Sequence, residues 1–324
     1  MCALSARLLA AALFLSSAVA APSREGASTS GYERAGLFRG PQNHLLLPTT
    51  ANGKPATFLL DTGAEISFLR ADRASDFGLR LLAREGRSLG RSFPLAALDD
   101  LQAGSAHLRQ TTFALYESSE FGGPIPGRNG KAADGVIGLD VLRRYRAVIN
   151  CRTREVFFRT DPARRLALAT TTRAMGFVQV PIRQSRRGYL AVPCSIRGRP
   201  GQLVVDTGAF VTALDDEAMR AIGLPSERSL LTARGFNGRV RPVFLAQTED
   251  LKIGAAVIAP QKFAVMDLFA ENKPRRTYTG INRIEYYSAQ KPAPGERIFG
   301  LLGNELLDQR RAIIDLDGMS LFLK

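Results

Sequence analysis

Hydrophobic residues in this chain fall in short runs rather than in long helical stretches. Runs of this kind include ATFLL (residues 56–60), QLVV (202–205), RAVIN (146–150) and RAIIDL (311–316). They are rich in β-branched or aromatic residues and are bounded by Gly, Pro or Asn, which is typical of β-strands. Short helices are expected at residues 70–77 and 215–222, and directly after Gly138 and Gly303. The pattern therefore predicts a mainly β protein with short helices.

The same order of elements occurs twice along the chain. Residues 45–60 align with residues 190–205 at an offset of 145, and residues 135–158 align with residues 300–323 at an offset of 165. The offset grows because the second half has longer loops. A chain of 324 residues has room for two such halves, so we expect two similar lobes.

The first 20 residues have the features of an export signal. Arg7 precedes an apolar run at residues 8–15, and a small-residue A-x-A site is formed by Ala18 and Ala20. This pattern predicts a signal peptide that is cleaved after Ala20, and hence a periplasmic or secreted protein; an uncleaved membrane anchor is the alternative. The predicted parts of the chain are a signal peptide (1–20), an amino-terminal extension (21–39), an N-terminal lobe (40–160), a linker (161–174) and a C-terminal lobe (175–324).

The formal net charge of +14 makes the chain strongly basic. Its Arg residues are scattered, and no nucleic-acid recognition motif accompanies them, so nucleic acid is not an expected partner. A basic surface instead favours a salt-sensitive electrostatic association with an anionic envelope surface. We expect the protein to be a monomer.

Histidine and cysteine limit the chemistry that the chain can perform. The only histidines, His44 and His107, lie near no second plausible metal ligand, so neither a metal site nor a histidine-based triad is expected, and no cofactor is expected. Removal of the signal leaves Cys151 and Cys194. One disulfide and two buried free thiols are both compatible with the sequence.

Each half carries the motif D-T-G-A at the end of an apolar strand. The first copy is Asp61, Thr62, Gly63 and Ala64, and the second is Asp206, Thr207, Gly208 and Ala209. A hydrophobic-hydrophobic-Gly step follows in each half, at Val136, Ile137 and Gly138 and at Leu301, Leu302 and Gly303. A single D-T-G arises easily by chance, whereas this duplicated combination does not.

On these motifs the sequence resembles the aspartic proteases of the retropepsin and pepsin superfamily, in the form in which two retropepsin-like lobes are fused in one chain. The resemblance covers nearly all of the chain after the signal, and D-T-G-A is closer to the retroviral type than to the D-T-G-S of pepsin-like enzymes. It implies a bilobal fold of two pseudo-twofold-related β-barrel-like lobes, and an endopeptidase that acts on a polypeptide substrate.

Elementary chemistry agrees with the resemblance. Peptide hydrolysis without a metal or a nucleophile requires a general base to activate water and a general acid to protonate the departing amine. Two adjacent carboxyl groups share one proton and titrate as a unit, with one pKa raised. Asp61 and Asp206 are therefore the predicted catalytic pair. The alternative is a noncatalytic peptide-binding or scaffolding protein that retains the fold.

The other motif residues have predicted supporting roles. Gly63 and Gly208 let the chain turn and bring amide groups to the carboxylates without an intervening Cβ atom. The resemblance implies that Thr62 and Thr207 hydrogen-bond across the lobes beneath the pair, and that the two hydrophobic-Gly steps pack behind the turns. Ala64 and Ala209 lack the hydroxyl donor of pepsin-like enzymes, which predicts an activity optimum at weakly acidic pH.

The resemblance also implies flap hairpins that cover the substrate. Candidate flaps are residues 84–95 and 232–242, of which the second contains Gly235 and Gly238 and is the better flap sequence. Glu65 follows the first D-T-G-A, where retroviral relatives have an acid that contacts the substrate backbone, whereas the second lobe has Phe210. The predicted substrate contacts are therefore Glu65, Gly235 and Gly238, and the lobes are not expected to be equivalent.

Overall fold

A computed structural model describes residues 31–88, 91–121, 123–127, 129–235, 240–269 and 295–324. The predicted signal peptide (1–20), residues 21–30 of the extension and the flap residue Gly238 lie outside the described residues. Among the described residues, no helix is long and apolar enough to cross a bilayer.

The first lobe is built on an eight-stranded sheet with the order β2-β3-β4-β9-β5-β8-β7-β6. Its strands are β2 (Phe38–Arg39), β3 (Leu45–Ala51), β4 (Lys54–Leu60), β5 (Phe68–Arg70), β6 (Arg80–Ser88), β7 (Arg91–Ala103), β8 (Ala106–Tyr116) and β9 (Gly135–Ile137). An additional pairing of β3 with β7 closes the run from β3 to β7 into a barrel. β4 and β9 run parallel, so the strand that leads into Asp61 lies beside the first hydrophobic-Gly step.

The second lobe repeats this arrangement in a ten-stranded sheet. Its strands are β13 (Arg183–Gln184), β14 (Leu190–Ile196), β15 (Arg199–Val205), β16 (Ala213–Asp215), β17 (Glu227–Arg234), β18 (Val240–Thr248), β19 (Lys252–Ile253), β20 (Ala256–Val257), β21 (Gln261–Met266) and β22 (Ile298–Leu302). β15 and β22 run parallel, as β4 and β9 do in the first lobe. The internal repeat in the sequence is therefore also a repeat of topology.

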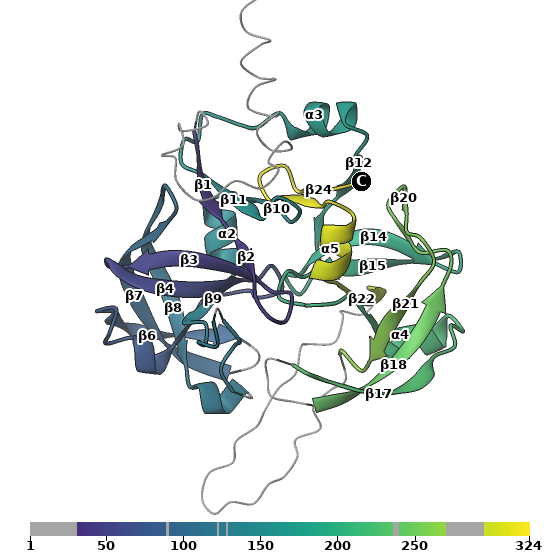
Figure 1. The fold of residues 1–324 in the computed structure, drawn as a ribbon, viewed down its shortest axis with the longest axis horizontal. Coiled ribbons are helices and arrows are strands. Elements are labelled where there is room, and N and C mark those ends of the chain that lie inside the picture. The colour runs from purple at the N-terminus through teal and green to yellow at the C-terminus, as the bar shows by residue number, and fades with distance from the viewer. Residues whose placement is uncertain (1–30, 89–90, 122, 128, 236–239, 270–294) are drawn as a thin grey trace, which may run out of the picture.

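A six-stranded sheet joins the lobes, with the order β1-β11-β10-β23-β24-β12. Its strands are β1 (Tyr32–Gly36), β10 (Val148–Asn150), β11 (Glu155–Arg159), β12 (Val178–Pro181), β23 (Ile313–Asp315) and β24 (Ser320–Leu323). Figure 1 shows this sheet above and between the first lobe, in purple and blue, and the second, in green. The antiparallel pairing of β10 with β23 joins the end of one repeat directly to the end of the other.

Two segments outside the predicted lobes have regular structure of their own. Residues 32–39, which fall in the predicted extension, form β1 and β2, and β1 is an edge of the joining sheet because it pairs with β11. The predicted linker, residues 161–174, contains the helix α3 (Leu168–Ala174).

Three of the four expected short helices are α-helices, and the fourth is a 3₁₀ turn. α2 (Leu139–Arg144) and α5 (Asn304–Gln309) follow the two hydrophobic-Gly steps, and α4 (Asp216–Ala221) lies in the second predicted position. Within residues 70–77 there is instead a 3₁₀ turn, η1 (Ala71–Arg73), and another, η2 (Ser118–Phe121), follows β8. The side chain of Asp215 accepts a hydrogen bond from the Ala218 amide and caps α4, whereas η1, like α2 and α5, has no side-chain cap.

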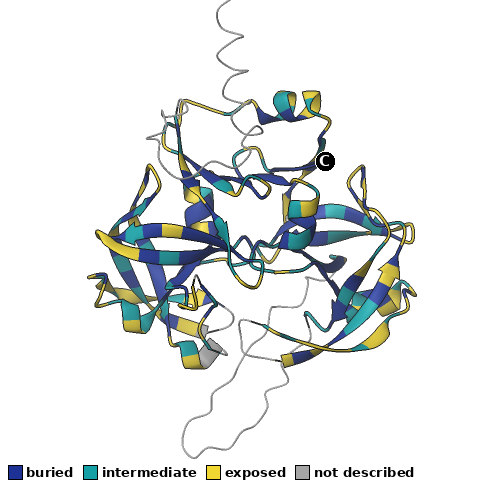
Figure 2. Cartoon of the chain, in the orientation of Figure 1, coloured by how far each residue is buried: buried dark blue, intermediate teal, exposed yellow. Residues whose placement is uncertain are grey.

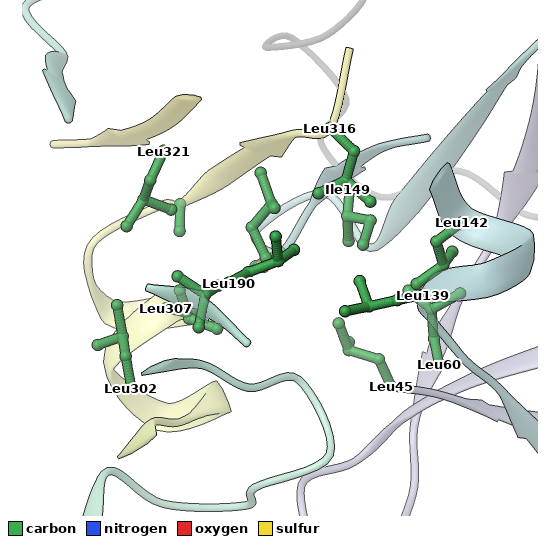
Figure 3. Packing of buried hydrophobic residues seen from close by; sticks show 14 of the residues in the cluster. Leu45, Leu60, Leu139, Leu142, Ile149, Leu190, Leu302, Leu307, Leu316 and Leu321 are labelled. Carbon is green, nitrogen blue, oxygen red and sulfur yellow. The ribbon is translucent and has the colours of Figure 1, made fainter. Parts of the chain in front are cut away.

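The hydrophobic core runs through both lobes and the joining sheet. Buried residues line the inner faces of the sheets, and exposed residues lie on the outer hairpins (Figure 2). Leucines of the first lobe, such as Leu60 and Leu139, and of the second, such as Leu302 and Leu307, belong to one cluster that also contains Ile149 of β10 (Figure 3). The lobes are therefore packed against one another through a common core.

Cys151 and Cys194 are both buried and free, so the structure has thiols rather than a disulfide at these positions. Burial raises the pKa of each thiol to about 12. A thiol of such high pKa is chemically inert near neutral pH, and both side chains act as apolar core residues.

Candidate active site

The two D-T-G-A turns start from equivalent places in the two lobes. Asp61 follows β4, and its backbone N–H donates to the carbonyl of Ile137 (3.0 Å); Asp206 follows β15, and its N–H donates to the carbonyl of Leu302 (3.1 Å). Each aspartate is therefore attached to the hydrophobic-Gly step of its own lobe, which fixes the point where the strand ends.

The turns meet so that each aspartate lies against the glycine of the other lobe. A Cβ atom built on Gly63 would lie 2.6–2.8 Å from the carboxyl atoms of Asp206, and one built on Gly208 would lie 2.4–2.5 Å from those of Asp61. Neither glycine has a positive φ. The requirement for glycine is therefore steric, because a side chain at either position would occupy the space of the opposite carboxyl group.

Backbone amides surround the carboxyl pair. Gly63 N–H donates to Oδ1 of Asp61 (2.7 Å), while the N–H groups of Gly208 and Ala209 both donate to Oδ1 of Asp206 (2.8 and 3.0 Å). Both carboxyl-bearing residues remain partly exposed, so solvent reaches them.

Ionisation of both carboxyl groups of the pair is energetically unfavourable. Burial raises the pKa of Asp61. Burial, followed by the neighbouring Asp61 carboxylate, raises the pKa of Asp206 well above its usual range. Amide donation opposes the rise at both groups. Carboxyl groups that interact in this way titrate as one unit.

Thr62 and Thr207 join the two lobes through hydrogen bonds next to the carboxyl pair. Each threonine backbone N–H donates to the hydroxyl of the other (3.0 Å in both directions). Each hydroxyl in turn donates to a carbonyl of the opposite lobe, Thr62 to Val205 (2.7 Å) and Thr207 to Leu60 (2.8 Å). Both residues are fully buried. Four buried hydrogen bonds therefore fix the relative position of the two turns.

The hydrophobic-Gly steps pack directly behind the turns. Val136 and Ile137 lie in β9, Leu301 and Leu302 lie in β22, and both steps pair with the strands that carry the aspartates. A Cβ atom on Gly138 would lie 2.7 Å from the Ile66 carbonyl, and one on Gly303 would lie 2.3 Å from the carbonyl carbon of Val211. The approach of these backbones allows Leu139 N–H to donate to Ala64 O (2.8 Å) and Asn304 N–H to Ala209 O (2.9 Å).

A second set of polar residues supports the steps and was not singled out from the sequence. Ser67 accepts from Gly138 N–H (2.9 Å) and donates to Asp140 (2.6 Å). In the second lobe, Thr212 Oγ1 accepts from Gly303 N–H (3.0 Å), and the Thr212 backbone N–H donates to Glu305 (2.6 Å). The signal was present in the repeat, because each hydroxyl lies six positions after its aspartate and each acid lies two positions after its glycine.

Asn304 makes the second turn different from the first. Its side chain is fully buried and donates to the Thr207 carbonyl (2.6 Å), whereas the equivalent position in the first lobe is Leu139. The second turn therefore accepts an additional hydrogen bond from the Asn304 side chain. The backbones of the two lobes are related by the repeat, but their side chains differ at this position.

Of the predicted substrate contacts, Glu65 and Gly235 are described by the structure and Gly238 is not. Glu65 is exposed at the end of the first turn, and Phe210 is 40% exposed at the end of the second. The candidate flaps are the hairpins β6–β7 and β17–β18, and Gly235 directly follows β17. Within the described part of the chain, no group of three or more His, Cys, Asp or Glu side chains is arranged to hold a metal ion.

Two related β lobes with a carboxyl pair at their junction define a bilobal protein of the aspartic-protease type. The sequence model of the aspartyl protease family matches residues 47–141 and 192–306, one stretch in each lobe. The chain therefore belongs to the aspartyl protease family.

Other comparisons are more distant. No curated protein matches the sequence. A retropepsin-like aspartic protease from Rickettsia conorii is 15% identical, with 40% of this chain and 90% of that chain covered and a TM-score of 0.28. An aspartic proteinase from Irpex lacteus is 15% identical, with 90% of this chain and 96% of that chain covered and a TM-score of 0.46.

Proposed function

We propose that this protein is an aspartic endopeptidase in which Asp61 and Asp206 jointly activate a water molecule. The observation that carries the proposal is the approach of each carboxyl group to the glycine of the opposite turn, at 2.4–2.8 Å from the position of a Cβ atom. This approach supports a single, partly exposed site that is shared by two acids from different lobes. Membership of the aspartyl protease family supports the same function.

The proposed reaction uses the shared proton of the pair. The ionised carboxylate removes a proton from water, and the water oxygen attacks the carbon of the scissile peptide carbonyl. The protonated carboxyl donates to the carbonyl oxygen as negative charge develops there. Collapse of the tetrahedral intermediate breaks the C–N bond, and a proton from the pair passes to the departing amine. The raised pKa of Asp206 supports this division of roles.

Cleavage of an unstructured protein mixture tests the proposal. The wild-type protein and the variants Asp61→Asn and Asp206→Asn would be incubated with the mixture between pH 3 and pH 8, and new amino termini would be identified by mass spectrometry. Each substitution removes half of the acid–base pair, so we expect a loss of at least about 100-fold in cleavage rate. A wild-type protein that binds peptides and cuts none of them would establish the noncatalytic alternative.

We further propose that the protein is exported and that its basic surface contacts anionic polymers of the envelope. The signal-like composition of residues 1–20 and the net charge of +14 support this proposal. A mature amino terminus at Ala21, determined by terminal sequencing, is the expected result for export. Binding to anionic phospholipid vesicles should weaken as salt rises from about 0.05 to 0.5 M, and binding that is independent of salt would contradict the electrostatic association.

A further inference from the structure

Asn43 of the first lobe holds the end of the catalytic turn of the second lobe. Its side-chain Nδ2 donates to the backbone carbonyl of Phe210 (3.0 Å), the residue that directly follows the second D-T-G-A. The next residue of the first lobe, His44, makes an edge-to-face contact with the Phe210 ring, with ring centroids 6.5 Å apart. Phe210 is therefore held by the opposite lobe through both its backbone and its ring.

The orientation of the Asn43 side chain is fixed by its two partners. Arg39 donates from Nη1 to Oδ1 of Asn43. A guanidinium group only donates hydrogen bonds and a carbonyl only accepts them, so the amide oxygen faces Arg39 and the amide nitrogen faces Phe210. Both contacts require the same orientation of the amide group.

These contacts belong to a closed ring of interactions around the end of the second turn. Arg39 forms an ion pair with Asp308 of α5 (3.1 Å). The same helix begins at Asn304, whose backbone N–H donates to the carbonyl of Ala209 (2.9 Å). Two successive carbonyls are therefore held, that of Ala209 by its own lobe and that of Phe210 by the opposite lobe.

The held segment also carries a donor to the carboxyl pair. The N–H of Ala209 donates to Oδ1 of Asp206 (3.0 Å). Ala209 directly precedes Phe210, so a movement of Phe210 changes the backbone dihedral angles that aim this N–H at Asp206. Such control of position matters for rate, because a displacement of about 1 Å at a reacting group costs on the order of 100-fold.

The equivalent turn of the second lobe lacks this contact. At the offset of 145, Asn43 corresponds to Gly188. The two turns have the same backbone form, since φ is positive at Asn43 (61°) and at Gly188 (88°). Each N–H also donates to the carbonyl three residues earlier, at Gly40 and at Ser185 (3.0 Å in both turns). Glycine adopts a positive φ at the least cost, so the turn alone favours glycine, and only the asparagine adds a side-chain donor for the opposite lobe.

We propose that Asn43 is a positioning residue that fixes Phe210 and thereby holds the second catalytic turn, with Asp206, in register with Asp61. The inference rests on the proposed function, because the register of the two acids matters only if they act together on one water molecule. Gly188 offers no side-chain donor to the first turn, so the two aspartates are held differently.

Hydrogen exchange and steady-state kinetics of the full chain test this role. The wild type would be compared with Asn43→Gly, which keeps the left-handed backbone, and with Asn43→Asp, which keeps the shape but at about pH 6 has no N–H to donate. Each variant loses one neutral hydrogen bond that resists local opening of the second turn. Exchange of the Ala209 N–H should therefore be about 2- to 12-fold faster, while exchange of the Gly63 N–H in the first turn stays unchanged.

The kinetic readout uses a peptide that the wild type cuts. For both variants kcat should fall by about 2- to 12-fold with KM unchanged, because the lost hydrogen bond acts on the catalytic pair rather than on the bound substrate. A role in folding alone would lower the free energy of unfolding and leave kcat of the folded enzyme as it is.

Asn52→Gly is the matched control. Asn52 lies in the β3–β4 hairpin of the same lobe, has a positive φ (45°), and donates from Nδ2 to the Phe77 carbonyl (2.9 Å). The substitution removes the same kind of hydrogen bond outside the catalytic turns. It should lower the free energy of unfolding and leave kcat and the exchange of the Ala209 N–H at their wild-type values.

A folded Asn43→Gly variant with wild-type kcat and wild-type exchange at Ala209 would overturn the inference. If neither variant of Asn43 folds, the wild-type side chain decides. Nδ2 protons of Asn43 that exchange as fast as those of the exposed Asn129 would exclude the hydrogen bond to Phe210, whereas slower exchange would support it.

The outcomes for the inference and for the proposed function are distinct. A wild-type protein that cuts no peptide would contradict the proposed function, whatever the exchange of Ala209 shows. A wild-type protein that cuts peptides, combined with unchanged kcat and exchange in Asn43→Gly, would reject only the role of Asn43.

Discussion

Gly208 packs so closely against Asp61 that a Cβ atom built on the glycine would lie 2.4–2.5 Å from the carboxyl atoms, and the matching contact joins Gly63 to Asp206. The contact explains why glycine follows D-T in both motifs. Each lobe supplies one acid and also the open space that the opposite acid occupies. The pair therefore exists only when both turns are in place.

Gly208→Ala should disable the pair with limited effect on the fold. The new methyl group would lie 2.4–2.5 Å from the Asp61 carboxyl atoms, so the turn or the carboxyl must move. Displacement of a reacting group by about 1 Å costs on the order of 100-fold in rate. Cleavage assays should show a loss of at least that size, with a fall of about 1–3 kcal/mol in the free energy of unfolding from overpacking.

Gly36→Ala is the matched control for this substitution. A Cβ atom there meets nothing within 4 Å, and its φ is not in the left-handed region, so activity should be unchanged. Full activity in Gly208→Ala would show that the packing of the turns is not needed for function.

Thr207→Val should destabilise the junction of the lobes. The substitution retains the shape of the side chain but removes the hydroxyl, which leaves Thr62 N–H and Leu60 O without their partners. Each unsatisfied buried group costs about 1–3 kcal/mol, so the free energy of unfolding in urea should fall by about 2–6 kcal/mol. Thr207→Ser retains the hydroxyl and should recover most of the loss. Equal stability of the Val and Ser variants would rule out the hydrogen bonds as the cause.

Asp206→Asn should change how stability depends on pH. The folded state raises the pKa of Asp206, so between the ordinary carboxyl value and the raised value the folded state binds more proton than the unfolded state. Stability from this group is therefore present below about pH 4 and is lost as pH rises through that interval. The Asp206→Asn variant should not lose this stability as pH rises. Its free energy of unfolding, relative to that of the wild type, should therefore increase from about pH 4 to about pH 7.

The exposed Asp99→Asn variant provides the control, because it removes a carboxyl on the surface of the first lobe. Its unfolding curves should follow those of the wild type over the same pH interval. A constant difference between Asp206→Asn and wild type at every pH would contradict the raised pKa.

Ala209→Ser should move the pH optimum of cleavage downward. The serine hydroxyl adds a donor beside a backbone N–H that already binds Asp206 at 3.0 Å, and an additional donor favours the ionised carboxylate. The acid limb of the pH–rate profile should move to lower pH, and we expect the wild-type optimum in the weakly acidic range. A wild-type optimum below about pH 3, well under the ordinary carboxyl range, would contradict the explanation based on Ala64 and Ala209.

Short-range patterns in the sequence determined much of the architecture. Short apolar runs bounded by turn residues predicted strands such as β4 and β15, because strand formation depends on local side-chain patterns. The duplicated D-T-G-A motif and the hydrophobic-Gly steps predicted two lobes and one pair of acids. The helix expected at residues 70–77 was wrong in type, because only the 3₁₀ turn η1 (Ala71–Arg73) is present there.

Only the tertiary structure decided how the two copies cooperate. Gly208 and Asp61, which contact each other across the lobes, are 147 residues apart in the sequence, and contacts over that separation leave no local pattern. For the same reason, the joining sheet that includes β1 and the role of Ser67 and Thr212 behind the turns became visible only in three dimensions. Local propensity determines elements, whereas the distance between a carboxyl group and a glycine in another lobe is determined by how those elements pack.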